Sequence, residues 1–424
     1  MNEWRRLTMA DVMLEFHDGP HATPAEADSG PVYLGIKNIT DSGTLDLSDY
    51  RPISEEDFAH WTRRVEPRAN DVVFTYEATL HRYALIPEGF RGCLGRRIAL
   101  IRPDASKVVP RYLHFMMLGP EWRSTVTARI ISGSTVDRVP IKTFPAFPIS
   151  IPSLRAQQAV VATLGSIDDL IENNRRRIEV LEKMAQTIYR EWFVHFRYPG
   201  HEDVGFVNSS LGPIPEGWAV RSVADLCSRI QSGGTPRRSE PSFWTDGTVD
   251  WYKTGDLTDS ILIGSSEQIT EHAVSSSSTR TFGPETILMA IYGSPTVGRL
   301  GLVETTSSAN QAALGLVANP QVSSTIHLWF VLRELREPLN RIAQGAAQQN
   351  VSKKKVAEAQ AIAPTARLVD QFTEVAGSPW RLAHRLAHAS AVLARTRDLL
   401  LPKLVTGEID VSALDLDALV GATS

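Results

Sequence analysis

The 424-residue sequence contains only two cysteines, Cys93 and Cys227, which lie far apart and have no metal-ligand neighbours. A disulfide framework and a zinc site are therefore not expected, and this cysteine usage favours the cytoplasm. The sequence has no apolar run long enough to cross a bilayer, and residues 1–6 lack the charged-then-apolar layout of a signal peptide. We expect a cytoplasmic protein with no membrane partner.

Sequence motifs for catalysis are missing as well. An adenine methyltransferase would carry a Gly-rich cofactor loop after a strand and an Asn/Asp-Pro-Pro-aromatic motif, and neither occurs. The absence of a Gly-Lys-Ser/Thr P-loop excludes ATP-driven translocation by this chain alone. The sequence shows no convincing carboxylate cluster for a nuclease metal. We therefore expect no catalytic residue, no metal site and no cofactor on this chain.

The overall charge is weakly acidic, with a formal net charge of -4, whereas nucleic-acid binders are usually basic. The charge is uneven, however, because residues 90–142 carry ten Lys and Arg side chains against three acidic ones. Such a local basic face can hold phosphates although the rest of the molecule is acidic. A solvated surface of mixed charge remains the alternative for any single cluster.

The chain contains an internal repeat with an offset of about half its length. Each match is weak alone, but the constant order of the matches makes coincidence improbable, and a period this long indicates a duplicated domain rather than a solenoid. The matched segments are Trp4 and Trp218, 38–41 and 256–259, 70–73 and 284–287, 113–115 and 328–330, 134–136 and 349–351, and 151–152 and 363–364.

The first part of each copy is rich in Gly, Pro, Ser and Thr and has short β-branched and aromatic runs, such as residues 71–76 and 286–292. These runs predict strands and loops of an α/β (α+β) domain. The predicted organisation is a first recognition domain (1–150), a central long helix (151–198), a linker with a second recognition domain (199–365), and a distal long helix with a closing segment (366–424).

The second part of each copy predicts a long helix with a heptad seam. In the first helix the seam is Val160, Leu164, Ile167, Ile171, Asn174, Ile178 and Leu181, continuing through Ala185, Ile188 and Trp192. In the second helix it is Phe372, Val375, Pro379, Leu382, Leu386, Ala389, Leu393, Thr396 and Leu400.

The two seams match in phase, so we expect the helices to pair with each other as an antiparallel coiled coil. Two amphipathic helices that each pack on their own domain are the alternative. Gly377, Ser378 and Pro379 are expected to break or kink the second helix near its start, because proline removes a helical hydrogen bond.

A pair of long helices between two similar domains predicts a spacer with a reading head at each end. The first seam spans on the order of 50 Å, and one turn of B-DNA is roughly 34–36 Å. Because the two heads share a frame but differ in nearly every loop, each is expected to read a different short sequence.

This arrangement resembles the specificity subunits of type I restriction-modification systems. The segments that carry the resemblance are 151–158, 167–174, 191–196, 215–218, 233–236 and 401–409, and the similarity covers essentially the whole chain. The resemblance implies a subunit that gives sequence specificity to two methyltransferase subunits and, with them, to restriction subunits. It also implies methylation of adenine, with S-adenosylmethionine, ATP and Mg²⁺ held by the partner subunits.

Direct readout of double-stranded DNA requires polar side chains that reach the edges of bases. In the first copy we favour Lys37, Asn38, Tyr76, His81, Arg82, Arg96, Arg97, Ser134 and Thr135. In the second copy we favour Gln231, Gly233, Gly234, Thr235, Lys253, Tyr292, Arg299, Gln348, Gln349 and Asn350. Gly233 and Gly234 would let the backbone approach a phosphate, and an ordinary turn between strands explains them equally well.

Two other functions remain open at this point. One is a cryptic nuclease that uses scattered acidic residues such as Asp71 and Glu77. The other is an assembly scaffold in which the coiled coil joins proteins and the globular domains bind protein without reading a sequence.

Overall fold

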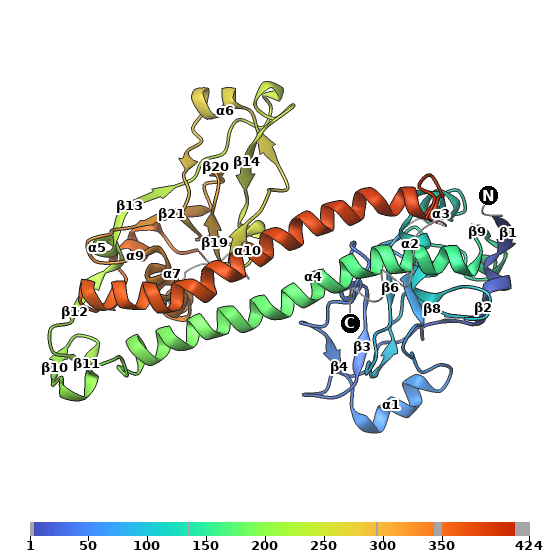
Figure 1. Cartoon of the computed structure of the whole chain (residues 1–424), viewed down its shortest axis with the longest axis horizontal. Helices are drawn as coiled ribbons and strands as arrows, with labels where there is room; N and C mark the ends of the chain where they lie inside the picture. Colours follow the sequence, from blue (N-terminus) through green and yellow to red (C-terminus); the bar gives the residue numbers. More distant parts are fainter. Residues whose placement is uncertain (1–3, 134–135, 294–295, 343–349, 412–424) are drawn as a thin grey trace. The chain divides into compact units, whose positions relative to one another are not determined.

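The structure is a computed structural model that describes residues 4–133, 136–293, 296–342 and 350–411. The chain forms two compact units (Figure 1). The first, here called unit 1, contains residues 1–171 and 393–424, and unit 2 contains residues 172–392. Two long helices, α4 (Leu154–Tyr189) and α10 (Ala366–Val405), each contribute a segment to both units.

Unit 1 is built on a four-stranded antiparallel sheet in the order β2-β8-β5-β6, with a smaller sheet in the order β4-β3-β7. Strand β1 pairs with β9, so the segment before the sheet closes against the segment that enters α4. The strands are β1 (Arg5–Thr8), β2 (Met13–Asp18), β3 (Val32–Leu34), β4 (Arg51–Pro52), β5 (Val72–Thr75), β6 (Tyr83–Leu85), β7 (Gly92–Leu94), β8 (Ile98–Pro103) and β9 (Pro148–Ile151). The helices are η1 (Met9–Val12), η2 (Ile36–Asn38), α1 (Glu55–Thr62), α2 (Pro110–Leu118), α3 (Pro120–Thr127) and η3 (Phe144–Ala146).

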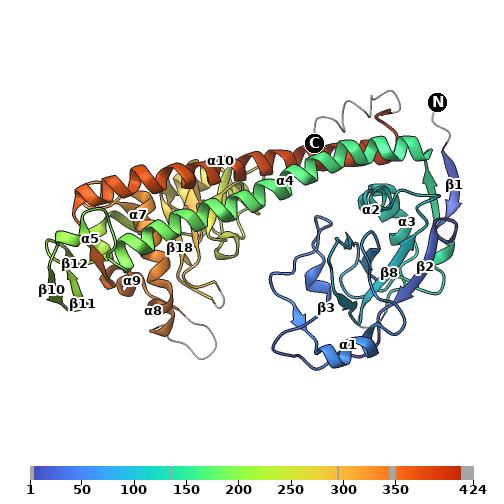
Figure 2. The ribbon, with the colours of Figure 1, turned by 60° about the horizontal axis from the view of Figure 1, so that its bottom comes forward.

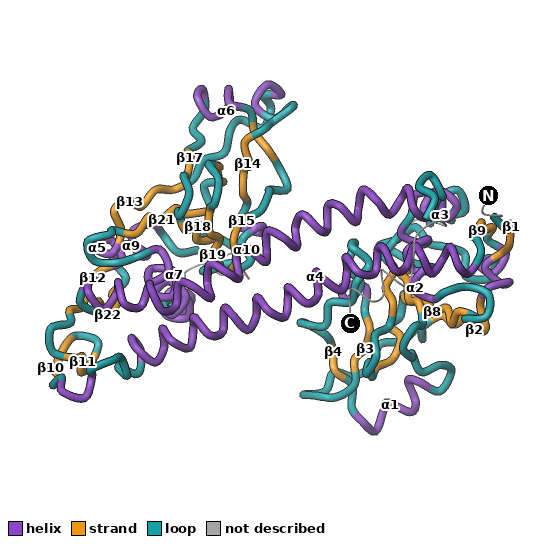
Figure 3. The backbone as a smooth tube through the Cα atoms, in the orientation of Figure 1, coloured by secondary structure: helices purple, strands orange, loops and turns teal. Residues whose placement is uncertain are grey.

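Unit 2 repeats this plan with a five-stranded sheet in the order β13-β21-β18-β19-β15 and a four-stranded sheet in the order β16-β14-β20-β17 (Figure 3). The main strands are β13 (Cys227–Ser232), β14 (Val249–Tyr252), β15 (Ser260–Leu262), β16 (Gln268–Ile269), β17 (Thr281–Phe282), β18 (Ile287–Ala290), β19 (Leu300–Val303), β20 (Ser307–Ala309) and β21 (Ala313–Ala318). Outside these sheets, β12 (Ala219–Ser222) pairs with β22 (Gln360–Ala363), and β10 (Phe206–Ser209) pairs with β11 (Gly212–Pro215). The helices are η4 (Arg190–Val194), η5 (His201–Asp203), α5 (Val223–Leu226), η6 (Pro241–Phe243), η7 (Thr254–Asp256), α6 (Glu271–Ser276), α7 (Thr325–Glu334), α8 (Arg336–Arg341) and α9 (Lys353–Glu358).

The strand registers confirm the predicted duplication. Val72 lies opposite Ile101 in unit 1, and Ile287 lies opposite Leu316 in unit 2. Two predicted matches were wrong. Val351 corresponds to Val139 and not to Val136, because the N–H of each donates to the carbonyl of the residue directly after the aligned strand, Ile291 or Tyr76. In addition, Asn70 corresponds to Glu285 and not to Pro284. Both of these residues enter their strand with a positive φ, 71° for Asn70 and 63° for Glu285. Similarity between short sequence segments does not determine how the two copies align residue by residue, whereas the hydrogen-bonded strand pairs do.

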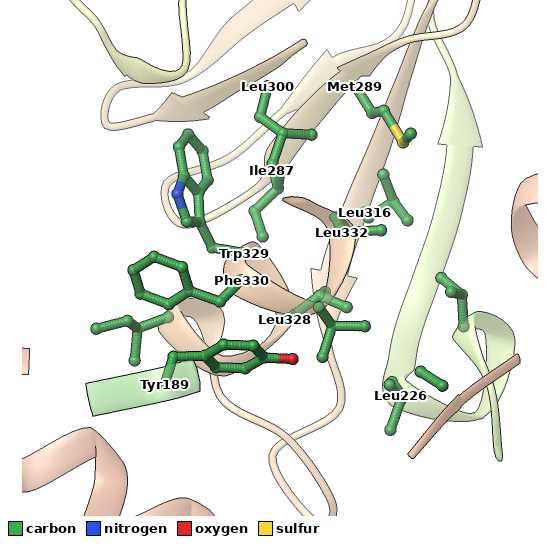
Figure 4. Close-up of a cluster of buried hydrophobic side chains, with 14 of the residues drawn as sticks. Tyr189, Leu226, Ile287, Met289, Leu300, Leu316, Leu328, Trp329, Phe330 and Leu332 are labelled. Atoms are coloured by element: carbon green, nitrogen blue, oxygen red, sulfur yellow. The ribbon is translucent and has the colours of Figure 1, made fainter. Parts of the chain in front are cut away.

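The core of unit 2 lies between the five-stranded sheet and α7, and Figure 4 shows part of it. Every residue of helix α7 from Ile326 to Leu332 is buried, and all of them except His327 are apolar, so the helix is enclosed on several sides. Tyr189 at the end of α4 stacks on Phe330 with ring centroids 5.3 Å apart, and Phe193 packs against Trp218. The aromatic side chains that follow α4 are therefore core residues of unit 2.

Helices α4 and α10 pack side by side and antiparallel, as predicted (Figures 1 and 2). Within unit 1, Arg397 donates to Asp168 at 3.1 Å, and within unit 2, Asn174 donates to the hydroxyl of Ser390 at 3.2 Å. The predicted seam of α4 lies inward, with Val160, Leu164 and Asn174 buried and with Ile167, Ile171, Ile178 and Leu181 partly buried.

The seam predicted for α10 needs a correction. Leu382, Leu386 and Leu393 are partly buried, but Val375 is 51% exposed and Ala389 is exposed as well. The stripe that faces inward runs one position later, through Ala383, Ala387 and Ser390. Because alanine recurs on every side of this helix, its apolar pattern does not determine the phase of the seam.

Gly377, Ser378 and Pro379 do not break the second helix, since α10 is continuous through all three residues. Proline at position 379 removes the N–H that would bond to the carbonyl of Val375. The packing of the flanking turns holds the helix together, since Phe372, Ala376, Trp380 and Ala383 are buried.

Candidate nucleic-acid interface

In unit 1, three segments meet at one end of the four-stranded sheet: the loop after β5 (76–82), the turn before β8 (95–97), and residues 136–139. The N–H of Tyr76 donates to the carbonyl of Arg97 at 3.1 Å, and the N–H of Val139 donates to the carbonyl of Tyr76 at 2.8 Å. We call these segments the loop end of unit 1. Polar and basic side chains project from a backbone that main-chain hydrogen bonds hold in place.

The same bonds build a loop end in unit 2 from residues 291–293, 296–299, 310–312 and 350–351. The N–H of Ile291 donates to the carbonyl of Ala312 at 2.8 Å, and the N–H of Val351 donates to the carbonyl of Ile291 at 2.9 Å. The two units share one more hydrogen bond, just after β2 in unit 1 and just after β13 in unit 2. The N–H of Gly19 donates to the carbonyl of Ile98 at 2.8 Å, and the N–H of Gly233 donates to the carbonyl of Ala313 at 3.0 Å.

These shared bonds align the two loop ends residue by residue. Arg96 in the turn of unit 1 corresponds to Gln311 in unit 2, since the residues that follow them, Arg97 and Ala312, accept equivalent bonds. Further along, Glu77 forms a bridge with Arg138 where Tyr292 forms one with Asn350. Arg138 therefore corresponds to Asn350.

The turn that carries Arg96 is clamped by two buried tyrosines. The N–H of Arg96 donates to the hydroxyl of Tyr33 at 3.0 Å, and the hydroxyl of Tyr76 donates to the carbonyl of Arg96 at 3.0 Å. Burial raises the pKa of Tyr76 to about 12, so its hydroxyl remains a donor at neutral pH. The exposed guanidinium of Arg96 thus extends from a rigid backbone.

Two of the residues predicted to contact DNA are instead structural. Tyr76 is buried and positions Arg96. Asn38 is 1% exposed, and its amide donates to the carbonyls of Asp46 and Asp49 while its oxygen accepts from the N–H of Gly35. Both side chains are buried and bond within the protein, so neither is presented to a base.

The other predicted residues of unit 1 are at or near the surface. His81, Arg82, Arg96 and Arg97 belong to the loop end, whereas Lys37 lies in η2 and pairs with Asp49 at 2.7 Å. Arg82 pairs with Asp41 at 2.8 Å, and burial, assisted by Arg123, lowers the pKa of His81. Ser134 and Thr135 lie outside the described residues.

In unit 2, Gln231, Gly233, Gly234 and Thr235 lie at the end of β13 or directly after it. A Cβ atom on Gly233 would come within 2.2 Å of the carbonyl oxygen of Asn310, and one on Gly234 within 2.3 Å of that of Ser278. Close backbone packing therefore requires both glycines, which supports the turn reading of this motif. The hydroxyl of Thr235 donates to the side-chain oxygen of Gln311.

The remaining predicted residues of unit 2 fall into two groups. Tyr292, Arg299 and Asn350 belong to the loop end, and Tyr292 is 39% exposed. Lys253 follows β14 at the smaller sheet and pairs with Glu267 at 2.7 Å. Gln348 and Gln349 lie outside the described residues.

Sequence reasoning missed Gln311 and Arg138 as candidate contacts. Neither belongs to a recognisable motif, and Arg138 was noted only as part of a basic stretch. The internal repeat identifies both residues once the backbone hydrogen bonds determine how the two copies align. In the part of the chain that the structure describes, no cluster of His, Cys, Asp or Glu has the form of a metal site. No described helix is long and apolar enough to span a bilayer.

The chain contains two copies of one mixed α/β domain, which are joined through paired helices. Each copy ends in a polar loop end, and the two loop ends differ in composition. These features define a duplicated recognition protein. A family model described as the type I restriction modification DNA specificity domain matches residues 38–183 and 215–365, one segment in each copy. The chain belongs to this family, the specificity subunits of type I restriction-modification systems, which are not themselves catalytic.

The chain is similar to two curated specificity subunits. It is 24% identical over 308 residues to that of the type I restriction enzyme MjaIX of Methanocaldococcus jannaschii, covering 72% of this chain and 71% of the relative. It is 22% identical over 378 residues to that of HindI of Haemophilus influenzae, covering 74% of this chain and 80% of the relative. The fold also matches the crystal structure of a type I S subunit from M. genitalium, with a TM-score of 0.55, 14% identity and coverage of 95% and 96% of the two chains.

Proposed function

We propose that this specificity subunit binds an asymmetric, bipartite DNA target, with one half-site read by the loop end of each unit. The observation that carries the proposal is the pair of loop ends, which share backbone hydrogen bonds but present different side chains. A shared frame gives both ends the same way of approaching a duplex, and different side chains give each end its own base preference.

The two long helices set the spacing between the half-sites in this proposal. Helix α4 has 36 residues, which corresponds to a length of about 54 Å. Its antiparallel pairing with α10 stiffens it, and the partly buried hydrogen bond from Asn174 to Ser390 favours one register of the pair. Target sequence and target spacing are therefore encoded in separate parts of the chain.

Two methyltransferase subunits and the restriction subunits are the proposed protein partners. Support comes from the relatives, which are named as specificity subunits of type I restriction enzymes. S-adenosylmethionine, ATP and Mg²⁺ would be bound by those partner subunits. The two halves of the helix pair offer them two related docking surfaces.

Selection from a random duplex pool by the chain in complex with its methyltransferase subunits tests the proposal. We expect enrichment of one split motif with a fixed spacer. Inserting seven residues into both helices, next to Asn174 and next to Ser390, should lengthen that spacer by about three base pairs, because seven helical residues span about 10 Å. Both half-sites should stay unchanged.

Two results would contradict the proposal. If the complex enriches no sequence, the chain is an assembly scaffold without readout. Cleavage of plasmid by the purified chain with Mg²⁺ alone would instead indicate a nuclease.

A further inference from the structure

The aligned loop ends differ systematically in chemistry at two positions. Unit 1 carries arginine at both positions, Arg96 and Arg138, whereas unit 2 carries side-chain amides, Gln311 and Asn350. Arg96, Arg138 and Gln311 are exposed, whereas Asn350 is partly buried and its side-chain oxygen is fully buried. The alignment rests on backbone hydrogen bonds and not on sequence similarity. The two units therefore carry different residue types at structurally equivalent backbone positions.

The two arginines are available for a ligand. Among the residues that the structure describes, no carboxylate forms an ion pair with Arg96 or Arg138. Their neighbours differ in this respect, since Arg82 is paired with Asp41 and Arg97 lies 3.6 Å from Glu77. The tyrosine clamp on the backbone of Arg96 further limits the entropy that an ordered contact would cost.

Gln311 is oriented by its neighbours in a comparable way. Its turn is fixed because the side-chain oxygen of Asn310 accepts from the N–H of Ala312 at 3.1 Å. The hydroxyl of Thr235 occupies one lone pair of the Gln311 oxygen, which leaves the second lone pair and both amide hydrogens for another partner. Thr235 is thus a positioning residue for Gln311.

Arginine and the side-chain amides prefer different bases in the major groove. An arginine donates two parallel hydrogen bonds to O6 and N7 of guanine, whereas Asn and Gln accept from N6 and donate to N7 of adenine. We propose that the loop end of unit 1 reads guanine through Arg96 and Arg138, and that the loop end of unit 2 reads adenine through Gln311. This inference rests on the proposed function and assigns a base to each half-site.

Reciprocal substitutions in the assembled methyltransferase complex test this assignment by selection from random duplex pools. In Arg96→Gln, one guanine of one half-site should lose its preference over adenine by about 10- to 100-fold, with the other half-site unchanged. In Gln311→Arg, one adenine of the opposite half-site should shift toward guanine by a similar factor. Assembly of the complex, measured by size-exclusion chromatography, should not change, because both side chains are exposed.

Matched controls are available at the opposite end of each sheet. Arg68 is exposed before β5, and Gln321 is exposed after β21. Arg68→Gln and Gln321→Arg make the same chemical exchanges away from the loop ends and should leave the motif unchanged.

The outcomes separate this inference from the proposed function. A wild-type split motif that stays the same in Arg96→Gln and Gln311→Arg would overturn the base assignment and leave the proposed function standing. An equal loss of affinity for all sequences would also overturn it, since that result indicates phosphate contacts. If the wild-type complex enriches no sequence, both the function and the assignment fail.

Discussion

Unit 1 and unit 2 share a backbone plan but stabilise it with different chemistry. At the end of the sheet opposite to the loop end of unit 1, Arg102 on β8 bonds to Asp71 and to Glu15. Val317 lies opposite Arg229 in unit 2, where unit 1 has Arg102 opposite Glu15. The ion network is thus absent from the aligned positions of unit 2. The comparison teaches that the hydrogen-bonded frame is the common element, and that the side chains attached to it, buried or exposed, vary independently.

The largest expected difference between the units comes from this ion network. Asp71 has a side chain that is 3% exposed, and Arg102 donates to it at 2.9 Å. Arg102→Met leaves the buried carboxylate without its partner and should lower the unfolding free energy of unit 1 by about 3–5 kcal/mol. Urea titration of the full chain measures this loss when unfolding is monitored by hydrogen exchange, in β5 for unit 1 and in β18 for unit 2. Arg82→Met is the control, because the exposed pair with Asp41 contributes at most about 1 kcal/mol.

Acidification should affect unit 2 more than unit 1. Burial lowers the pKa of His114 in unit 1 to about 4, and it lowers those of His327 and His384 in unit 2 to about 4. The folded state disfavours the charged ring, so this stability is present above pH 6.5 and is lost as the pH falls toward 4.

Each histidine should cost about 2 kcal/mol between pH 7 and pH 5. His327→Gln removes one of the titrating groups of unit 2 and should flatten its pH dependence by that amount. Unfolding midpoints in urea at the two pH values measure the effect. An unchanged slope in His327→Gln would contradict the buried-histidine explanation.

The two long helices differ in that only α10 contains prolines, Pro379 and Pro402. Pro379→Ala restores the N–H and its hydrogen bond, a gain of about 3 kcal/mol in a helix interior. The substitution also makes the unfolded chain more flexible, which offsets about 1 kcal/mol, so a net stabilisation of about 2 kcal/mol is expected. Thermal unfolding of the chain checks this value. A loss of stability in Pro379→Ala would mean that the fold requires proline at this position.

The smallest effect concerns a feature that both units share. Ser222 caps α5 by accepting from the N–H of Asp225 at 3.2 Å, and Thr8 stands at the aligned position of unit 1, before η1. Ser222→Ala should destabilise unit 2 by about 1 kcal/mol, whereas Ser222→Thr should be nearly neutral. Chemical denaturation of both variants tests the equivalence, and a large cost for threonine would argue against it.

The sequence predicted the duplication, the mixed α/β class and the antiparallel helix pair, because each depends on patterns that extend over many residues. It failed where a local pattern is ambiguous. Alanine on every side of α10 hid the phase of its seam, and the rule against helical proline ignored the packing of the turns that flank Pro379.

Candidate contacts were harder to predict for a related reason. Asn38 and Tyr76 have the chemistry of base-reading residues, but long-range hydrogen bonds use them inside the fold. Gln311 and Arg138 carry no motif, and only the register of distant strands reveals them. Exposure and pairing at such positions depend on tertiary contacts, which no local window of sequence contains.

The two units also differ in how the chain supplies them. Unit 2 is formed by one continuous stretch, residues 172–392, whereas unit 1 needs residues 393–411 to complete its core. Leu401, Leu404 and Val411 pack there with Val160 and Leu164 of α4. During synthesis, unit 2 therefore has all its residues first. Unit 1, although its first residues emerge earlier, keeps apolar surface exposed until residues 393–411 have been added. Unit 2 is thus completed before unit 1, although unit 1 begins earlier in the chain.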